Sequence, residues 1–158
     1  MIIRKKEMIS PGNTKPWNRT AVSTMVVAAF MCASVFGSMR EGVSLALEAA
    51  LPYVKDGFKI REDNWHGETR SGSQLLVKHQ LFRGNEYWFW AATSFPNSAS
   101  TVGVFDSKGN SVSLESFSRD GKSGVRVLPN KTGTYFIRVT VTSTEHKELD
   151  WGLVYGYR

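Results

Sequence analysis

The chain has 158 residues, of which 41% are hydrophobic and 22% are charged, and its formal net charge is +6. This length is enough for one domain with a core of its own, and the composition is that of an ordinary globular protein. Residues 1–37 carry five basic side chains against one acidic side chain, which leaves only +2 for the rest of the chain and argues against a nucleic-acid-binding protein.

The N-terminal segment has the three parts of a secretory signal. A basic stretch precedes residues 21–36, which read AVSTMVVAAFMCASVF and carry no charge. This apolar run is shorter than the roughly 20 residues that a membrane-spanning helix needs. We therefore predict a signal peptide over residues 1–37, with cleavage after Gly37. Cleavage near Ala46 or Ala49 is an alternative, and so is an uncleaved membrane anchor.

The single cysteine, Cys32, lies inside this apolar run. The residues directly before it, Ala29-Phe30-Met31, are not the small residues that precede a lipid-modified cysteine, so we expect no lipid there. After cleavage the chain would hold no cysteine and no disulfide, and its core alone would have to stabilise it. This usage is typical of an exported bacterial protein, which indicates a periplasmic or extracellular location.

Residues 38–57 are predicted to form a linker or a short helix. Apolar residues recur there at three- and four-residue steps, which is the periodicity of one helix face. These residues are Val43, Leu47, Ala50, Leu51 and Val54. Because Pro52 falls within the pattern, we expect the helix to end near Leu51.

From residue 58 to residue 158 the hydrophobic pattern changes to alternation, which is typical of β-strands. The alternating runs lie at residues 58–61, 75–81, 87–93, 101–106, 112–117, 125–127, 134–142 and 151–155. Turn-forming residues such as Asp120-Gly121 and Lys131-Thr132-Gly133 separate them. We therefore predict an all-β domain over residues 58–158, an antiparallel jelly-roll-like β-sandwich of about eight strands. Val112, Leu114 and Phe117 are expected to face its core.

Four segments in this region form an ordered series. They are Leu81–Phe89, Val104–Asn110, Thr132–Val139 with its Gly-Thr-Tyr, and the closing Leu153–Tyr155. Over residues 75–157 their order and spacing resemble the bacterial pre-peptidase C-terminal domain. The resemblance implies a jelly-roll-like sandwich in a secreted bacterial protein and a non-catalytic module. It also implies calcium binding, or contact with an insoluble substrate, as activities found in some members.

Four aromatic residues stand in a row as Tyr87-Trp88-Phe89-Trp90. Side chains of a strand alternate between its two faces, so Trp88 and Trp90 point outward if Tyr87 and Phe89 face the core, as the family pattern implies. Two explanations of this outward pair remain open. In the first, residues 43–60 lie across the indoles and bury them, and Trp65 joins them.

In the second explanation the outward indoles form an aromatic binding platform. Phe136 and Arg138 would point outward too, because the alternate residues of the run 134–142 are apolar. The candidate ligand-binding residues are Trp65, Trp88, Trp90, Phe136 and Arg138. Flat indole rings suit the faces of sugar rings, and tryptophan is enriched at protein contacts.

Metal and catalytic sites have weak sequence signals. Asp63, His66 and Glu68 could approach one another, but a solvated polar loop is the favoured interpretation of these residues. Asp63 and Asp106 are candidate calcium ligands because carboxylate oxygens bind that ion, although Asp106 stands where a turn-forming residue is expected. His79 alternates with apolar neighbours and is expected to face the core. We predict no cofactor and no enzyme activity.

These observations predict an exported, non-catalytic binding or accessory module for a polysaccharide or a protein partner, in the bacterial envelope or outside the cell. The alternative is a structural or assembly protein of the envelope without a small ligand. A remote alternative, a metal-dependent hydrolase, requires Asp63, His66 and Glu68 to converge. Contact with a membrane is expected only through the signal segment.

Overall fold

The computed structural model describes residues 41–158, and the predicted signal segment 1–37 lies outside the described residues. Within them, residues 41–54 form a helix, and eight strands follow. The strands are β1 (Lys59–Arg70), β2 (Gln74–Leu81), β3 (Tyr87–Ala92), β4 (Ser98–Phe105), β5 (Ser113–Arg119), β6 (Lys122–Val127), β7 (Gly133–Ser143) and β8 (Glu148–Tyr157). The predicted antiparallel sandwich of about eight strands is confirmed.

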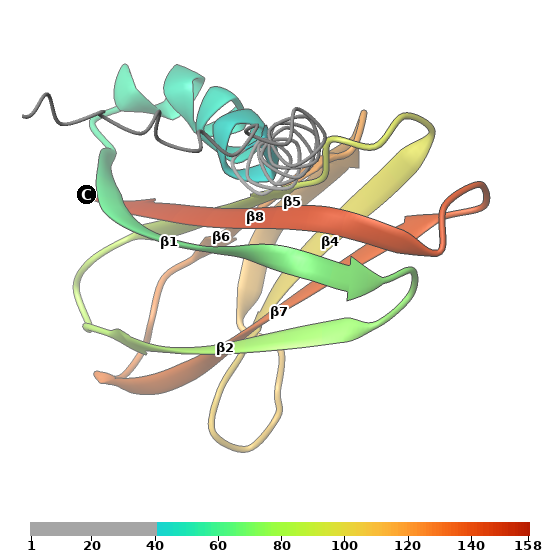
Figure 1. Cartoon of the computed structure of the whole chain (residues 1–158). Helices are drawn as coiled ribbons and strands as arrows, with labels where there is room; N and C mark the ends of the chain where they lie inside the picture. Colours follow the sequence, from blue (N-terminus) through green and yellow to red (C-terminus); the bar gives the residue numbers. More distant parts are fainter. Residues whose placement is uncertain (1–40) are drawn as a thin grey trace, which may run out of the picture. The chain divides into compact units, whose positions relative to one another are not determined.

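The strands form two sheets packed face to face (Figure 1). The five-stranded sheet has the order β1-β8-β3-β6-β5, and the three-stranded sheet has the order β2-β7-β4. β1 pairs with β8, β2 with β7 and β3 with β6, and all three pairs are antiparallel. This nested pairing is that of one long hairpin wound into a sandwich, as in a jelly roll.

The main core fills the space between the two sheets. Tyr87 and Phe89 of β3 point into it, and alternate residues of β7 do the same, as the sequence predicts. These β7 residues are Tyr135, Ile137, Val139 and Val141. Burial of an apolar side chain of this size contributes about 1.5–3 kcal/mol relative to its exposure, so this core is the main source of stability.

The helix lies across the outer face of the five-stranded sheet and forms a second apolar layer with it (Figure 1). Trp88 and Trp90 of β3 point into this layer from the sheet, and Ala46 and Ala50 point into it from the helix. Trp88 is 3% exposed, and the other three side chains are completely buried. The described domain therefore has three layers, which are the helix, the five-stranded sheet and the three-stranded sheet.

The buried face of the helix differs from the predicted one. Leu47, Leu51 and Val54 belong to the predicted apolar stripe, yet these side chains are 37%, 61% and 49% exposed. Ala50 and Val43 of the stripe do face the sheet, and Ala46, which the stripe did not include, is buried beside them. Tyr53 and Leu45 of the helix also pack against this layer, so its buried face is set by position on the helix and not by hydrophobicity alone.

The helix extends to residue 54, so the end predicted near Leu51 is wrong. Pro52 is exposed and lies in the last turn, where its missing N–H costs one backbone hydrogen bond. Among residues 41–158, no helix has both the length and the apolar character that spanning a membrane requires.

A glycine-centred cap ends the helix. The amide of Gly57 donates to the carbonyl of Val54 at 3.1 Å, and the amide of Phe58 donates to the carbonyl of Tyr53 at 3.2 Å. Gly57 has a φ of +89°, a conformation that glycine adopts without steric cost. The rings of Phe58 and Tyr53 also meet edge to face at 6.4 Å. The cap turns the chain back onto the sheet, where β1 begins.

The start of the described helix lies directly on β8. A Cβ placed on Gly152 of β8 would overlap the backbone of Gly42 and Val43. A Cβ placed on Gly42 would lie 2.9 Å from the backbone nitrogen of Gly152. No side chain fits between these two backbones, so glycine at both positions sets the distance between the helix and the sheet.

β1 is longer than the alternating run that predicted it. It continues to Arg70 and so includes Asp63, His66 and Glu68, for which the sequence favoured a polar loop. Trp65, Gly67 and Thr69 are partly buried, and the residues between them are exposed. Because β1 is an edge strand with a solvated outer face, its polar residues outnumber its apolar ones and hide the strand pattern.

The predicted inward face of β5 is correct only in part. Val112 packs against the main core, but Leu114 is 58% exposed and Phe117 lies in the layer beneath the helix. The register of β5 against β6 shifts between Ser113 and Glu115. A bulge of this kind changes which side chains face inward, and strict alternation cannot anticipate it.

Gly152→Val should lift the helix from β8, because a side chain there overlaps the helix backbone. Overpacking of this kind costs about 1–3 kcal/mol, so we expect the free energy of unfolding to fall by that amount in urea denaturation. Since the helix covers Trp88 and Trp90, acrylamide should also quench tryptophan fluorescence more strongly.

Gly133→Ala is the matched control, because a Cβ at Gly133 meets no atom within 4 Å. It should change neither measurement by much. Unaltered quenching and stability in Gly152→Val would contradict the direct contact between the helix and β8.

Candidate binding surface

The two outward indoles of β3 form a parallel pair beneath the helix. The ring centroids of Trp88 and Trp90 are 6.0 Å apart, and the ring planes differ by 8°. Tyr53 of the helix lies over both, with centroid distances of 4.6 Å to Trp88 and 5.3 Å to Trp90. Tyr53 thus occupies the position that a stacked ligand would need. Residues 43–60 cover the indoles, as the first explanation from the sequence expects, and the pair is not an exposed platform.

Trp65 lies apart from this pair, so the expectation that it joins the covered indoles is wrong. It is partly buried at the margin of the main core. Its ring centroid is 5.5 Å from that of His79 and 5.9 Å from that of Tyr155. His79 faces the core as expected, and the centroids of the His79 and Tyr155 rings are 4.5 Å apart. Burial lowers the pKa of His79, and the Asp63 carboxylate opposes this shift only in part.

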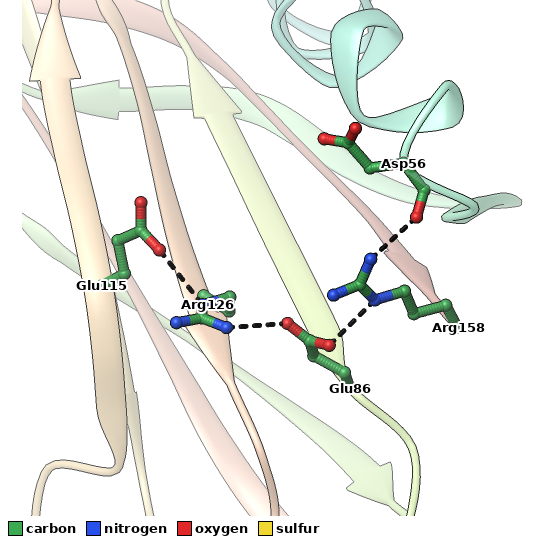
Figure 2. Close-up of polar contacts among 5 residues, drawn as sticks. All are labelled: Asp56, Glu86, Glu115, Arg126 and Arg158. Atoms are coloured by element: carbon green, nitrogen blue, oxygen red, sulfur yellow. Dashed lines mark hydrogen bonds and ion pairs between the residues drawn. The ribbon is translucent and has the colours of Figure 1, made fainter.

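A charged network connects the end of the helix to the five-stranded sheet (Figure 2). Glu86, just before β3, accepts hydrogen bonds from Nη1 of Arg126 at 2.9 Å and from Nε of Arg158 at 2.8 Å. Nη1 of Arg158 also donates to the backbone carbonyl of Asp56 at 2.8 Å. The Nε of Arg126 lies 3.1 Å from Oε2 of Glu115 without hydrogen-bond geometry, so this contact is an ion pair only.

The network lines a hollow of about 440 Å³ beside the covered indoles. Burial raises the pKa of Glu86, but the hydrogen bonds from Arg126 and Arg158 outweigh this effect and hold the pKa below its usual range. Glu86, Glu115 and the two arginines around the hollow are therefore paired with one another. This arrangement indicates a role in joining the helix to the sheet rather than in holding a ligand.

The three-stranded sheet presents the other outer face of the sandwich, on the side away from the helix (Figure 1). Phe136 and Arg138 of β7, which the sequence predicts to point outward, lie on this face. Strand pairing places Lys78 of β2 and Phe105 of β4 beside Phe136, and Leu76 of β2 beside Arg138. Leu76 is 61% exposed. We call these five residues the open-face cluster.

Each aromatic ring of the open-face cluster forms a cation–π contact with a basic side chain. The guanidinium carbon of Arg138 lies 4.4 Å from the ring centroid of Phe105, and Nζ of Lys78 lies 5.9 Å from that of Phe136. Such contacts contribute about 0.5–1 kcal/mol each at exposed sites, so the rings hold both cations against the sheet. Within residues 41–158 neither cation has a carboxylate at ion-pair distance.

Sequence reasoning identified two members of this cluster and missed the other three. Lys78 and Leu76 alternate with Val77, and Phe105 alternates with Val104, so the outward direction of all three follows from the strand period. Their position beside Phe136 depends on which strands pair, and that pairing is not visible in the local pattern.

A hollow of about 550 Å³ borders this face, between the connections β4–β5 and β6–β7. Lys108, Asn110, Lys131 and Thr134 contribute to its lining. The carboxylate of Asp106 accepts hydrogen bonds from the backbone amides of Asn110 and Lys108, both at 2.9 Å, and from the Asn110 side chain at 3.2 Å. The bonds from Asn110 contribute most to lowering the pKa of Asp106. The oxygens of this calcium candidate are therefore engaged within its own turn.

Asp63, His66 and Glu68, which the remote hydrolase alternative requires together, do not converge. His66 contacts the side chain of Asn64 through Nδ1 at 3.1 Å, whereas Asp63 accepts a hydrogen bond from the hydroxyl of Tyr155 at 3.4 Å. Residues 41–158 contain no group of three or more His, Cys, Asp or Glu side chains arranged to hold a metal ion. The convergence of Asp63, His66 and Glu68 that a metal-dependent hydrolase requires is absent from this part of the chain.

Comparison with known proteins adds little to this picture. No family model and no curated protein matches the chain. Among solved structures, PliG of Aeromonas hydrophila, a periplasmic inhibitor of g-type lysozyme, is similar over 61% of this chain and 85% of that chain, at 13% identity and a TM-score of 0.44. A similarity of this size does not bear on function. The resemblance to pre-peptidase C-terminal domains stays a prediction.

Glu86→Gln should destabilise the domain by about 1–3 kcal/mol at neutral pH, because two hydrogen bonds lose their ionised acceptor. The pKa of Glu86 is lower in the folded chain than in the unfolded chain. The ionised carboxylate therefore contributes fully to the free energy of unfolding above its unfolded-state pKa of about 4.3. That contribution is lost as the pH falls through the lower pKa of the folded chain. Urea denaturation from about pH 7 to about pH 3 should thus show a flatter acid profile in the variant.

Glu48→Gln serves as the control, since Glu48 forms one ion pair with Lys122 at 2.9 Å and its side chain is 61% exposed. An exposed pair contributes about 0–1 kcal/mol, so this variant should resemble the unsubstituted chain. If both variants gave the same acid profile as that chain, the network around Glu86 would have no stabilising role.

Proposed function

We propose that this chain is an exported, non-catalytic binding module that recognises a polysaccharide or a protein partner through the open-face cluster. The supporting observation is the contrast between the two outer faces of the sandwich. The helix covers one face and buries Trp88 and Trp90, whereas Leu76 and Arg138 of the other face are exposed and Phe136 is partly exposed.

The chemistry of the open-face cluster suits recognition. Arginine and aromatic side chains are enriched where proteins bind partners. Arg138 and Lys78 are held over rings of neighbouring strands, so they lose less side-chain freedom on binding than unsupported cations would. Rigid strands beneath them supply a fixed geometry, which favours a binding role over a solvated surface.

The exported character of the proposal rests on the signal-like order of residues 1–37. A structural or assembly protein of the envelope is the second candidate. The burial of Trp88 and Trp90 supports it, because that aromatic face is then part of the fold. It leaves the open-face cluster without a role, so we favour the binding module.

Photocrosslinking in the exporting bacterium tests the proposal even when the partner is unidentified. Leu76 and Leu114 form a matched pair, since both lie on strands and are 61% and 58% exposed, but on different sheets. Benzoylphenylalanine introduced at position 76 should give a light-dependent adduct with an envelope polymer or protein, detected by its altered migration.

The same group at position 114 should give no such adduct. Equal adducts from the two positions, or none from either, would overturn the assignment of the open-face cluster as the binding surface and favour the structural role. Export of the labelled chains, checked by fractionation, ensures that both positions meet the same envelope.

A further inference from the structure

The strands of the three-stranded sheet contain no acidic residue. β2, β4 and β7 contribute Lys78 and Arg138, and none of the three has Asp or Glu. In contrast β1, β5 and β8 of the five-stranded sheet all carry carboxylates. The open face is therefore positive although the chain apart from residues 1–37 is nearly neutral, and it favours an anionic partner.

Hydroxyl and amide groups continue the face beyond the open-face cluster. Gln74 of β2, Thr140 of β7 and Thr101 of β4 stand opposite one another in the strand register. Gln74 and Thr101 are exposed, and Thr140 is partly exposed. A flat row of such donors and acceptors matches a hydrated chain that offers hydroxyl groups along its length.

The hollow beside the sheet continues the same surface at its other end. Thr134 of β7 precedes Phe136 by two residues, so both lie on one face of the strand, and Thr134 also lines the hollow. Lys108 and Lys131 line this hollow as well. The carboxylate there, Asp106, is held within its turn by three hydrogen bonds. Cations therefore occur both in the open-face cluster and at this hollow. We call the surface from the row of Gln74, Thr140 and Thr101 to the hollow the strip.

We propose that this strip binds an anionic polysaccharide, with carboxylate or sulfate groups of successive sugars at Arg138, Lys78 and Lys131. The inference rests on the proposed binding role of the open-face cluster. An acidic protein fits less well, because protein interfaces centre on side chains that fill deep pockets. Here the rings of Phe105 and Phe136 already carry cations, and the surface offers a row of polar groups rather than an apolar pocket.

Affinity electrophoresis of the exported chain through gels that contain polygalacturonate or dextran sulfate tests this inference. Both polymers should retard the chain, and added salt should weaken the retardation because it screens exposed charges. Arg138→Gln and Lys78→Gln should each raise the dissociation constant about tenfold, the effect expected for loss of one charge-assisted hydrogen bond.

Arg119→Gln is the matched control. Arg119 also lies over a phenylalanine ring, with its guanidinium carbon 5.6 Å from the centroid of Phe117, but on the five-stranded sheet. The Arg119→Gln substitution removes one positive charge, as Arg138→Gln does, but it retains every cation of the strip. The dissociation constant should therefore stay within about twofold of that of the unsubstituted chain. If Arg119→Gln and Arg138→Gln lowered the affinity equally, the net charge of the chain alone would explain the effect, and the inference would be overturned.

Neutral dextran and poly-glutamate test whether the strip instead binds an uncharged polysaccharide or an acidic polypeptide. Retardation by dextran that equals retardation by polygalacturonate would contradict a charge-selective site. Retardation by poly-glutamate alone would assign the strip to an acidic polypeptide. Absence of retardation by every polymer overturns the inference as well. In each case a crosslink at position 76 would still support the proposed binding function, and its absence would remove both proposals.

Discussion

The architecture of this domain depends on the burial of two large apolar side chains, the indoles of Trp88 and Trp90. Trp88 and Trp90 point away from the main core, and aromatic side chains of this size each bury about 150–250 Å² when they are covered. The helix covers them with Tyr53, Ala46 and Ala50, and its backbone touches β8 at Gly152. A segment that resembled a linker is thus an integral layer of the fold. Once one outer face is closed in this way, only the outer face of the three-stranded sheet remains open within residues 41–158.

The two faces also differ in how they treat charge. Around the covered face, Glu86 and Glu115 pair with arginines, and this pairing joins the helix end to the sheet (Figure 2). On the opposite face Arg138 and Lys78 rest on aromatic rings, and no carboxylate of residues 41–158 lies at ion-pair distance from either. A cation on a ring keeps its charge available to a second molecule, whereas the charge of a cation in an ion pair is largely neutralised within the fold. Polar groups on one side are therefore structural, and those on the other side are suited to recognition.

The sequence predicted the architecture better than it predicted the exposed surfaces. Alternation located the strands and the outward direction of Arg138, because a strand with one wet face repeats every two residues. The helix face was assigned only in part, because hydrophobicity ranks Leu51 above Ala46, whereas Ala46 is the side chain that is buried against the sheet. The neighbours of Arg138, such as Phe105, follow from pairing between distant strands, and a local pattern contains no information on that pairing.

The nested strand pairing has a consequence for how the domain folds. β1, the first strand, finds its partner in β8, the last one, and the helix before β1 rests on Gly152 of that same last strand. Contacts between residues so far apart in the chain close large loops, and folding rates fall as such contacts come to dominate. Neither the helix nor the five-stranded sheet can be completed until β8 is present. For a chain that is predicted to cross a membrane, this dependence delays folding until β8 has been translocated.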